Sequence, residues 1–80
     1  MRVRVRYYAS FRDVTGKQEE WLEVPEGTTV QGIREHVRSL YENIARREQV
    51  LVAVNGTFPA LDRVIKEGDD VAFFPPVSGG

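Results

Sequence analysis

Apolar and charged side chains alternate at the start of the chain, which reads MRVRVRYY. Two sets of residues share a parity: Val3, Val5 and Tyr7 form one set, and Arg2, Arg4, Arg6 and Tyr8 form the other. Successive side chains of a strand point to opposite faces, so this alternation predicts a strand that is buried on one face. The alternation returns at residues 21–24, after a turn predicted at residues 13–17, with Leu22 and Val24 directed inward. The two strands predict a hairpin.

A helical period follows the break at Pro25-Glu26-Gly27. Thr28 and Gln31 have the spacing of a capping box, so we predict that a helix begins at Thr28. The apolar positions beyond it fall mostly at steps of three or four residues and gather on one stripe: Val30, Ile33, Val37, Leu40, Tyr41 and Ile44. We therefore expect a single helix that packs by this stripe.

Two or three short strands are predicted after the helix. Residues 50–54 are rich in β-branched side chains, and Asn55-Gly56 favours a tight reversal toward Thr57-Phe58. A turn at residues 67–69 precedes a last strand at residues 71–74, which Pro75 ends. This order predicts an α+β fold in which a mixed sheet carries one main helix on one face, arranged as a β-grasp if the first and last strands are neighbours. We expect one domain over residues 1–80, with residues 75–80 as an extended tail.

Composition narrows the possible functions. The chain has 80 residues, of which 41% are hydrophobic and 29% are charged, so a soluble globular domain is expected. It contains no cysteine and one histidine, which disfavours thiolate zinc sites, cysteine nucleophiles and histidine metal clusters, and we predict no metal site. A formal net charge of -1 argues against nucleic acid as a partner. No apolar run is long enough for a membrane span or a secretory signal, so the expected location is the cytoplasm and no membrane partner is expected.

The parity argument separates the aromatic residues into two groups. If the helix covers the face that carries Tyr7 and Phe73, then Tyr8 and Phe74 project from the opposite face. Phe58, just past the Asn-Gly turn, has no obvious helical partner and can join them. Two interpretations stay open, because an uncovered aromatic patch indicates a protein partner whereas a loop can also cover such side chains.

The chain ends in PPVSGG, which has unusual physical properties. Pro75 and Pro76 favour an extended segment, and the six residues 75–80 can reach roughly 18 to 20 Å. Gly79 and Gly80 lack Cβ atoms, so they can pass through a narrow channel. The terminal carboxylate is ionised at neutral pH and can attack the α-phosphate of ATP to form an acyl-adenylate. The alternative is an ordinary frayed terminus.

Four segments carry a resemblance to a known family: VRVRYYASFRDVTG, PEGTTV, VAVNG and EGDDVAFFPPVSGG. Together with the chain length, they resemble the ubiquitin-like sulfur carriers, and among these the small subunits of molybdopterin synthase. The resemblance implies a β-grasp fold and a C-terminal Gly80 that an E1-like activating enzyme adenylates with ATP. A persulfide donor then supplies the sulfur of a Gly80 thiocarboxylate, and no cofactor is bound by the carrier itself.

The resemblance also implies partners and a destination for the sulfur. The tail, with Pro75, Pro76, Val77, Ser78 and Gly79 leading to Gly80, inserts into the large synthase subunit, and sulfur passes to cyclic pyranopterin monophosphate. Hydrophobic side chains at positions matching Tyr8, Phe58 and Phe74 dock both the activating enzyme and the large subunit. Two small and two large subunits form a heterotetramer. The chain is then the sulfur donor of a sulfurtransferase complex and no enzyme on its own.

Two further functions and several residues stay open. The chain can be a carrier for thiazole or thionucleoside synthesis. It can also be a protein modifier conjugated to lysines through Gly80, or an interaction module with an inert terminus. Arg2, Arg4 and Arg6 line one strand face and either steer an acidic partner or are simply solvated. Trp21 is either an interface anchor or a sheet-edge residue. We assign no role to His36 and no acid-base role to the paired acids Glu19-Glu20 and Asp69-Asp70, because adjacent side chains point apart.

Overall fold

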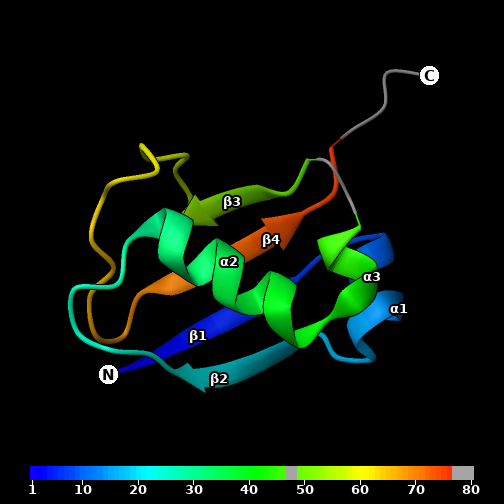
Figure 1. The fold of residues 1–80 in the computed structure, drawn as a ribbon, viewed down its shortest axis with the longest axis horizontal. Coiled ribbons are helices and arrows are strands. Elements are labelled where there is room, and N and C mark those ends of the chain that lie inside the picture. Colours follow the sequence, from blue (N-terminus) through cyan, green and yellow to red (C-terminus); the bar gives the residue numbers. More distant parts are fainter. Residues whose placement is uncertain (47–48, 77–80) are drawn as a thin grey trace.

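Four strands form one mixed sheet at the centre of the molecule (Figure 1). The structure is a computed structural model that describes residues 1–46 and 49–76. The strands are β1 (Arg2–Tyr7), β2 (Glu19–Glu23), β3 (Leu51–Val54) and β4 (Asp70–Phe74). Their order across the sheet is β2-β1-β4-β3, with β1 parallel to β4 and the other neighbours antiparallel. The first and last strands are therefore neighbours, as the β-grasp arrangement requires.

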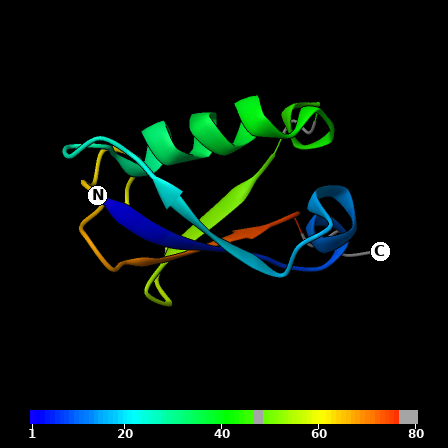
Figure 2. The same cartoon turned by 90° about the horizontal axis from the view of Figure 1, so that it is seen from below.

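Three helices accompany the sheet in the described part of the chain: α1 (Ser10–Thr15), α2 (Val30–Leu40) and α3 (Glu42–Ala45). Figure 2 shows α2 lying across one face of the sheet, which we call the covered face. No helix of the described residues lies across the other, open face (Figure 2). The predicted fold class, a mixed sheet with one main helix on one face, is confirmed.

The core lies between α2 and the covered face. Alternate residues of β1 and β4 contribute to it, and each is at most 1% exposed: Val3, Val5, Tyr7, Val71 and Phe73. The buried residues of α2 are Val30, Ile33 and Val37. This packing confirms the parity predicted for the first and last strands, since burial of apolar surface is the main favourable contribution to folding.

β1 and β2 pair antiparallel, which confirms the predicted hairpin, but the connection between them differs from the predicted turn. The sequence predicted a turn at residues 13–17, whereas the chain forms the short helix α1 and ends it at Gly16 in the left-handed conformation, with φ 73°. Phe11 is fully buried and anchors this helix to the core. A helix with one buried anchor and no side-chain cap leaves little periodicity in the sequence, which is why the pattern did not reveal it.

The main helix is shorter than predicted at both ends. Its N-cap is Thr29, whose Oγ1 accepts a hydrogen bond from the Gly32 N–H at 3.1 Å. Thr28 instead donates its hydroxyl to the Pro25 carbonyl at 2.6 Å and stabilises the preceding turn. At the other end Tyr41 leaves the helical conformation, so the apolar stripe is divided between α2 and α3. Leu40 consequently lies 49% exposed outside the core.

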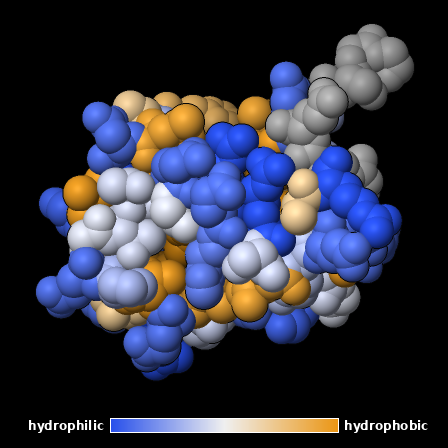
Figure 3. Space-filling view, in the orientation of Figure 1, coloured by the Kyte–Doolittle hydropathy of each residue, from blue (hydrophilic) through white to orange (hydrophobic). Residues whose placement is uncertain are grey.

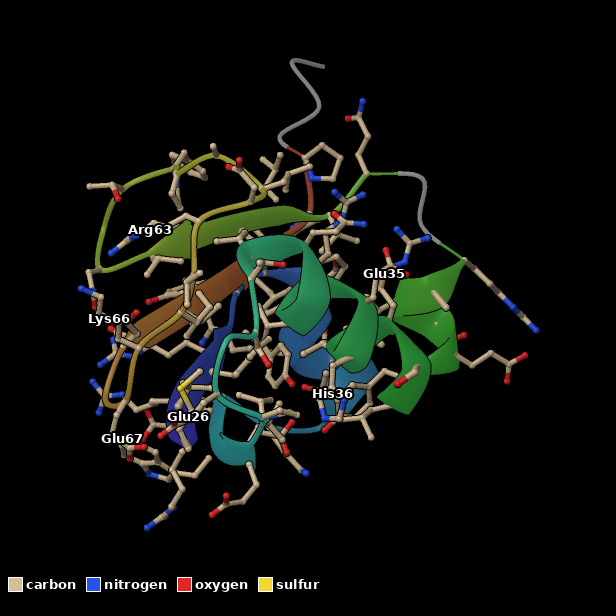
Figure 4. The ribbon with its side chains drawn as sticks, turned by 60° about the vertical axis from the view of Figure 1, so that its left-hand side comes forward. Glu26, Glu35, His36, Arg63, Lys66 and Glu67 are labelled. Carbon is tan, nitrogen blue, oxygen red and sulfur yellow. The ribbon has the colours of Figure 1, made fainter. Side chains whose placement is uncertain are left out.

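The helix side of the molecule is mainly hydrophilic over α2, with apolar areas at its margins (Figure 3). His36 is exposed on α2 (Figure 4), and we assign it no chemical role. Within the described residues, no helix is long and apolar enough to cross a membrane.

Candidate functional site

Tyr8 and Phe74 meet at the end of the sheet from which the tail departs. The N–H of Tyr8 donates to the Phe73 carbonyl at 3.1 Å, which continues the pairing of β1 with β4 by one residue. Both side chains project from the open face, and their rings stack with centroids 4.8 Å apart and an interplanar angle of 16°. Both are partly exposed. The predicted exposure of these two aromatics on the face opposite the helix is confirmed.

Phe58 joins the same group from a different part of the chain. Its ring centroid lies 6.2 Å from that of Phe74, and its side chain is 68% exposed. We call Tyr8, Phe58 and Phe74 the aromatic cluster. A large exposed aromatic group on an otherwise charged surface is typical of a docking site for another protein.

The turn before Phe58 is held by hydrogen bonds between Asn55 and two residues at the start of β4, Asp69 just before the strand and Asp70 as its first residue. Asn55 and Gly56 have φ angles of 51° and 82°, the pair of positive values that a type I′ hairpin turn requires. The Asn55 side chain donates to Asp69 Oδ1 at 3.0 Å and accepts from the Asp70 N–H at 3.0 Å. The predicted Asn-Gly reversal is confirmed, and the bonds to β4 determine where it delivers Phe58.

Leu51 is an apolar neighbour of the cluster that the sequence analysis did not single out. It pairs directly with Phe74 in the antiparallel register of β3 and β4 and is 38% exposed. Directly paired residues of adjacent strands share a face, so Leu51 extends the apolar surface toward the sheet edge. The sequence did contain a signal for this exposure, because Leu51 alternates with Val52 and Val54 along the strand and therefore points to the opposite face.

Charged side chains occupy the middle of the open face. The Nε atoms of Arg4 and Arg6 lie 3.7 and 3.3 Å from Asp70 Oδ1, and both lie 3.8 Å from Glu19 Oε2. We call these four residues the charge ladder. The Tyr8 side chain and the Asp70 carboxylate raise the pKa of Arg6 above its ordinary value, so Arg6 stays charged. The two cations of the ladder are matched by two anions.

A cavity of about 180 Å³ adjoins the ladder and the aromatic cluster. Its lining comes from the end of β1, from α1 and from the start of β2: Arg6, Tyr7, Tyr8, Arg12, Gln18 and Glu19. Arg12 was missed by the sequence analysis, because α1 was predicted as a turn. The helix places Arg12 in the wall of the same cavity as Tyr8.

A partly buried polar network lies on the covered side of β1 and β2. Glu20 Oε2 accepts hydrogen bonds from the hydroxyls of Tyr7 and Tyr41, each at 2.6 Å, and Glu20 Oε1 lies 3.0 Å from Lys17 Nζ. Burial alone opposes ionisation, but the bonds from Tyr41, Tyr7 and Lys17 outweigh it and lower the pKa of Glu20. Burial, aided by Glu20, raises the pKa of Tyr7, which therefore remains a donor. This network ties β1 and β2 to the end of α2.

The predicted tail begins directly after the last strand. Pro75 and Pro76 follow β4 directly, whereas Val77, Ser78, Gly79 and Gly80 lie outside the described residues. Trp21 is 52% exposed on the edge strand β2, where the Arg2 guanidinium lies 5.1 Å from its ring centroid, and it does not belong to the aromatic cluster. In the part of the chain that the structure describes, no three acidic or histidine side chains converge on a possible metal position.

Comparison with known proteins gives a family match and full-length relatives. Residues 5–80 match the model of the ThiS family. A molybdopterin synthase sulfur carrier subunit from Haemophilus influenzae is 35% identical, with 98% of this chain and 99% of the relative covered. A solved structure from Pyrococcus furiosus, described as putative molybdopterin converting factor subunit 1, is also 35% identical, with a TM-score of 0.89 and coverage of 96% and 99% of the two chains.

Other similar proteins broaden the comparison. Small archaeal modifier protein 3 from Haloferax volcanii is 27% identical over the full length of both chains. Subunits 1 and 2 of the Helicobacter pylori molybdopterin-converting factor have been solved as a complex, one chain of which is 21% identical to this protein, with a TM-score of 0.70 and full coverage of both. A Caldiarchaeum subterraneum ubiquitin, 16% identical with a TM-score of 0.69 and coverage of 100% and 98%, shares the fold, so the fold is ubiquitin-like.

Proposed function

Because this chain belongs to the ThiS family, we propose that it is the sulfur-carrier small subunit of molybdopterin synthase. The observation that carries the proposal is the aromatic cluster beside Pro75, where β4 passes into a tail whose sequence ends in Gly-Gly. A docking surface at the base of the tail allows a partner to hold the folded domain while the tail enters an active site. Full-length similarity to sulfur carrier subunits supports the same function.

The chemistry of the proposal takes place at the Gly80 carboxylate. An E1-like activating enzyme binds the aromatic cluster, and the carboxylate attacks the α-phosphate of ATP, which releases pyrophosphate and leaves an acyl-adenylate. The terminal sulfur of a persulfide donor then displaces AMP and gives an acyl disulfide. A thiol attacks the donor's sulfur and breaks the S–S bond, which leaves a thiocarboxylate on Gly80 and a disulfide between the donor and the thiol. This form retains a good nucleophile at neutral pH. The carrier contains no cysteine, so its sulfur is held at the terminus instead of on a side chain.

The large subunit of molybdopterin synthase is the proposed protein partner in which the carrier releases its sulfur. It binds the aromatic cluster in its turn and receives the tail, and the thiocarboxylate sulfur passes to cyclic pyranopterin monophosphate. The known complex of the two Helicobacter pylori subunits supports this choice of partner. We propose a heterotetramer of two small and two large subunits, in which the small subunit contributes sulfur and the large subunit contributes the catalytic side chains.

Protein modification is the second candidate, supported by the similarity to small archaeal modifier protein 3. The same acyl-adenylate can transfer Gly80 to the amine of a lysine, which gives an isopeptide bond in place of a thiocarboxylate. The two functions share the activation step and differ in the nucleophile that follows it. Adducts carrying Gly80 on lysines of other proteins would identify the second function.

Intact mass spectrometry tests the proposal. The purified chain is incubated with ATP, an activating enzyme of the family and a sulfide source, and we expect a mass increase equal to the exchange of one oxygen for sulfur at Gly80. Deletion of Gly80, or addition of one residue after it, is expected to abolish both this shift and sulfur transfer. Circular dichroism of these variants should match the parent chain, because the change lies beyond the sheet. Undiminished transfer by either variant contradicts the proposed role of Gly80.

A further inference from the structure

Arg12, in the wall of the cavity beside the aromatic cluster, carries a positive charge that has no partner among the described residues. The guanidinium of Arg12, on α1, forms no ion pair and no hydrogen bond with any described residue. The side-chain amide of Gln18, also in the cavity wall, makes no hydrogen bond within the same part of the chain. Arg12 and Gln18 are both exposed residues of the cavity wall, and their side chains have no hydrogen-bond partner among the described residues.

The remaining charges around the cavity are already balanced. In the charge ladder, Arg4 and Arg6 lie within 3.8 Å of both Glu19 and Asp70, so two cations face two anions. Arg12 adds one unit of positive charge to this neutral group. A surplus of one charge favours a singly charged carboxylate over a phosphate group, which carries nearly two negative charges at neutral pH.

The position of the cavity connects it to the aromatic cluster. Tyr8 lines the cavity and also stacks on Phe74 at 4.8 Å, so the two features share a side chain. Figures 1 and 2 show α1 at the end of the sheet where β4 passes into the tail. A protein that covers the cluster therefore also covers the rim of the cavity and removes water from Arg12. An unpaired cation that loses its water weakens a complex, whereas a carboxylate can accept two parallel hydrogen bonds from a guanidinium.

We propose that this cavity receives an aspartate or glutamate side chain of the large synthase subunit when that subunit docks on the aromatic cluster, with Arg12 as its principal contact. The inference rests on the docking role given to the cluster in the proposed function. The aromatic residues supply apolar contact area, and the cavity supplies orientation, because a paired charge is satisfied in one register only. A partner that presents an apolar or basic side chain at this point is rejected.

The test is the affinity of the full-length chain for the large subunit of molybdopterin synthase from the same organism, measured by titration calorimetry. We expect Arg12→Ala to weaken binding ~10-fold and Arg12→Glu to weaken it ~100-fold, since the first removes the contact and the second adds repulsion. Arg12→Lys retains the charge without the planar fork and should lie between the parent chain and Arg12→Ala. The salt dependence of binding should be weaker for Arg12→Ala than for the parent chain.

The matched control is Arg63→Glu, which changes the net charge by the same amount as Arg12→Glu. Arg63 lies on the loop beside the start of α2, where its carbonyl accepts from the Val30 N–H, at the other end of the molecule from α1 (Figures 1 and 4). The Arg63→Glu variant should bind the large subunit with the affinity of the parent chain. Thermal unfolding of every variant shows whether it is folded, and Arg12→Ala keeps a residue that favours helix in α1.

Phe74→Ala in the same assay separates this inference from the proposed function. Weaker binding by Phe74→Ala together with parental affinity of the Arg12 variants overturns the cavity proposal and leaves the docking role intact. Equal losses for Arg12→Glu and Arg63→Glu also overturn it, because they indicate long-range electrostatics without a specific contact. Parental affinity of Phe74→Ala and of all Arg12 variants overturns the docking surface and the cavity proposal together.

Discussion

The two faces of the sheet place neighbouring residues in opposite environments. Tyr7 and Phe73 point to the covered face and are at most 1% exposed. Tyr8 and Phe74, each one position further along the same strands, stack on each other at the open face. Both pairs consist of large aromatic residues, so composition does not distinguish them and only the direction of the side chain does.

This difference separates stability from recognition in a very small protein. On the covered face the aromatic area is buried in the folded monomer and contributes to the free energy of folding. On the open face the aromatic area remains partly in water, so under the proposed function it contributes to binding instead of to folding. Substitutions at adjacent positions should therefore have different consequences, and each of the following experiments compares the two faces.

Phe73→Ala should have the largest effect, a loss of about 3–5 kcal/mol in the free energy of unfolding. The ring is fully buried against Tyr7 and the α2 side of the core, so its removal leaves a cavity. Urea unfolding followed by circular dichroism measures the loss. If Phe73→Ala does not fold, Phe73→Leu leaves a smaller cavity and should cost about 1–1.5 kcal/mol. Equal losses for Phe73→Ala and Phe74→Ala contradict the assignment of the faces.

Phe74→Ala should weaken binding and leave stability nearly unchanged, the reverse of what is expected for Phe73→Ala. We expect binding to the large subunit to weaken by about 1–3 kcal/mol, as for an aromatic residue buried at an interface, while the free energy of unfolding changes by about 1 kcal/mol or less. Calorimetry with the purified large subunit measures the first quantity, and urea unfolding measures the second. Unchanged affinity would remove Phe74 from the interface.

Glu20→Gln should lower the free energy of unfolding by about 1–2 kcal/mol, because it removes the ionised acceptor of two tyrosine hydroxyls. In the unfolded chain Glu20 has an ordinary pKa near 4.5, and in the fold its pKa is lower. Its contribution is therefore fully present above pH 4.5 and is lost as the pH falls through the folded pKa.

Urea unfolding at several pH values tests this assignment. The difference in the free energy of unfolding between the parent chain and Glu20→Gln should shrink as the pH is lowered from 4.5 through the folded pKa of Glu20. Tyr41→Phe is a matched variant that removes one donor and keeps the carboxylate, so it should retain the acid dependence with a smaller loss. A constant difference between parent and Glu20→Gln at all pH values contradicts the network as the source of the pH dependence.

Glu19→Gln should have the smallest effect, a change of about 0.5 kcal/mol or less in the free energy of unfolding. Glu19 belongs to the charge ladder on the open face, and its side chain is half exposed, so water screens its contacts with Arg4 and Arg6. Urea unfolding beside Glu20→Gln compares adjacent acidic residues on the two faces. A loss as large as that of Glu20→Gln would show that the ladder stabilises the fold.

Much of the candidate site was predictable because its signals are local. Alternation along β1 and β4 depends on the strand period alone, so Tyr8 and Phe74 were placed on the open face from residue parity. The Asn55-Gly56 turn was predictable because its backbone conformation favours those residue types. The roles given to the aromatic cluster and to Gly80 remain predictions that the binding and mass measurements address.

The missed elements depend on contacts between residues far apart in the chain. The single helix predicted through Ile44 breaks where the Tyr41 hydroxyl bonds to Glu20, 21 positions earlier, and no local pattern signals that bond. The short helix α1 is fixed by burial of one residue, Phe11, which a periodicity search does not resolve. Arg12 was overlooked together with the helix that carries it.

The sequence by itself determined which side chains share a face, where the chain can reverse, and that it ends in two residues without side chains, because these properties follow from neighbouring residues. Only the tertiary structure brought Phe58 to Phe74, through the bonds of Asn55 to Asp69 and Asp70. It also placed Arg12, which has no ion pair among residues 1–46 and 49–76, in the wall of the cavity that Tyr8 lines. Both arrangements depend on the packing of distant segments, whose energies are set by burial and hydrogen-bond geometry that no local pattern contains.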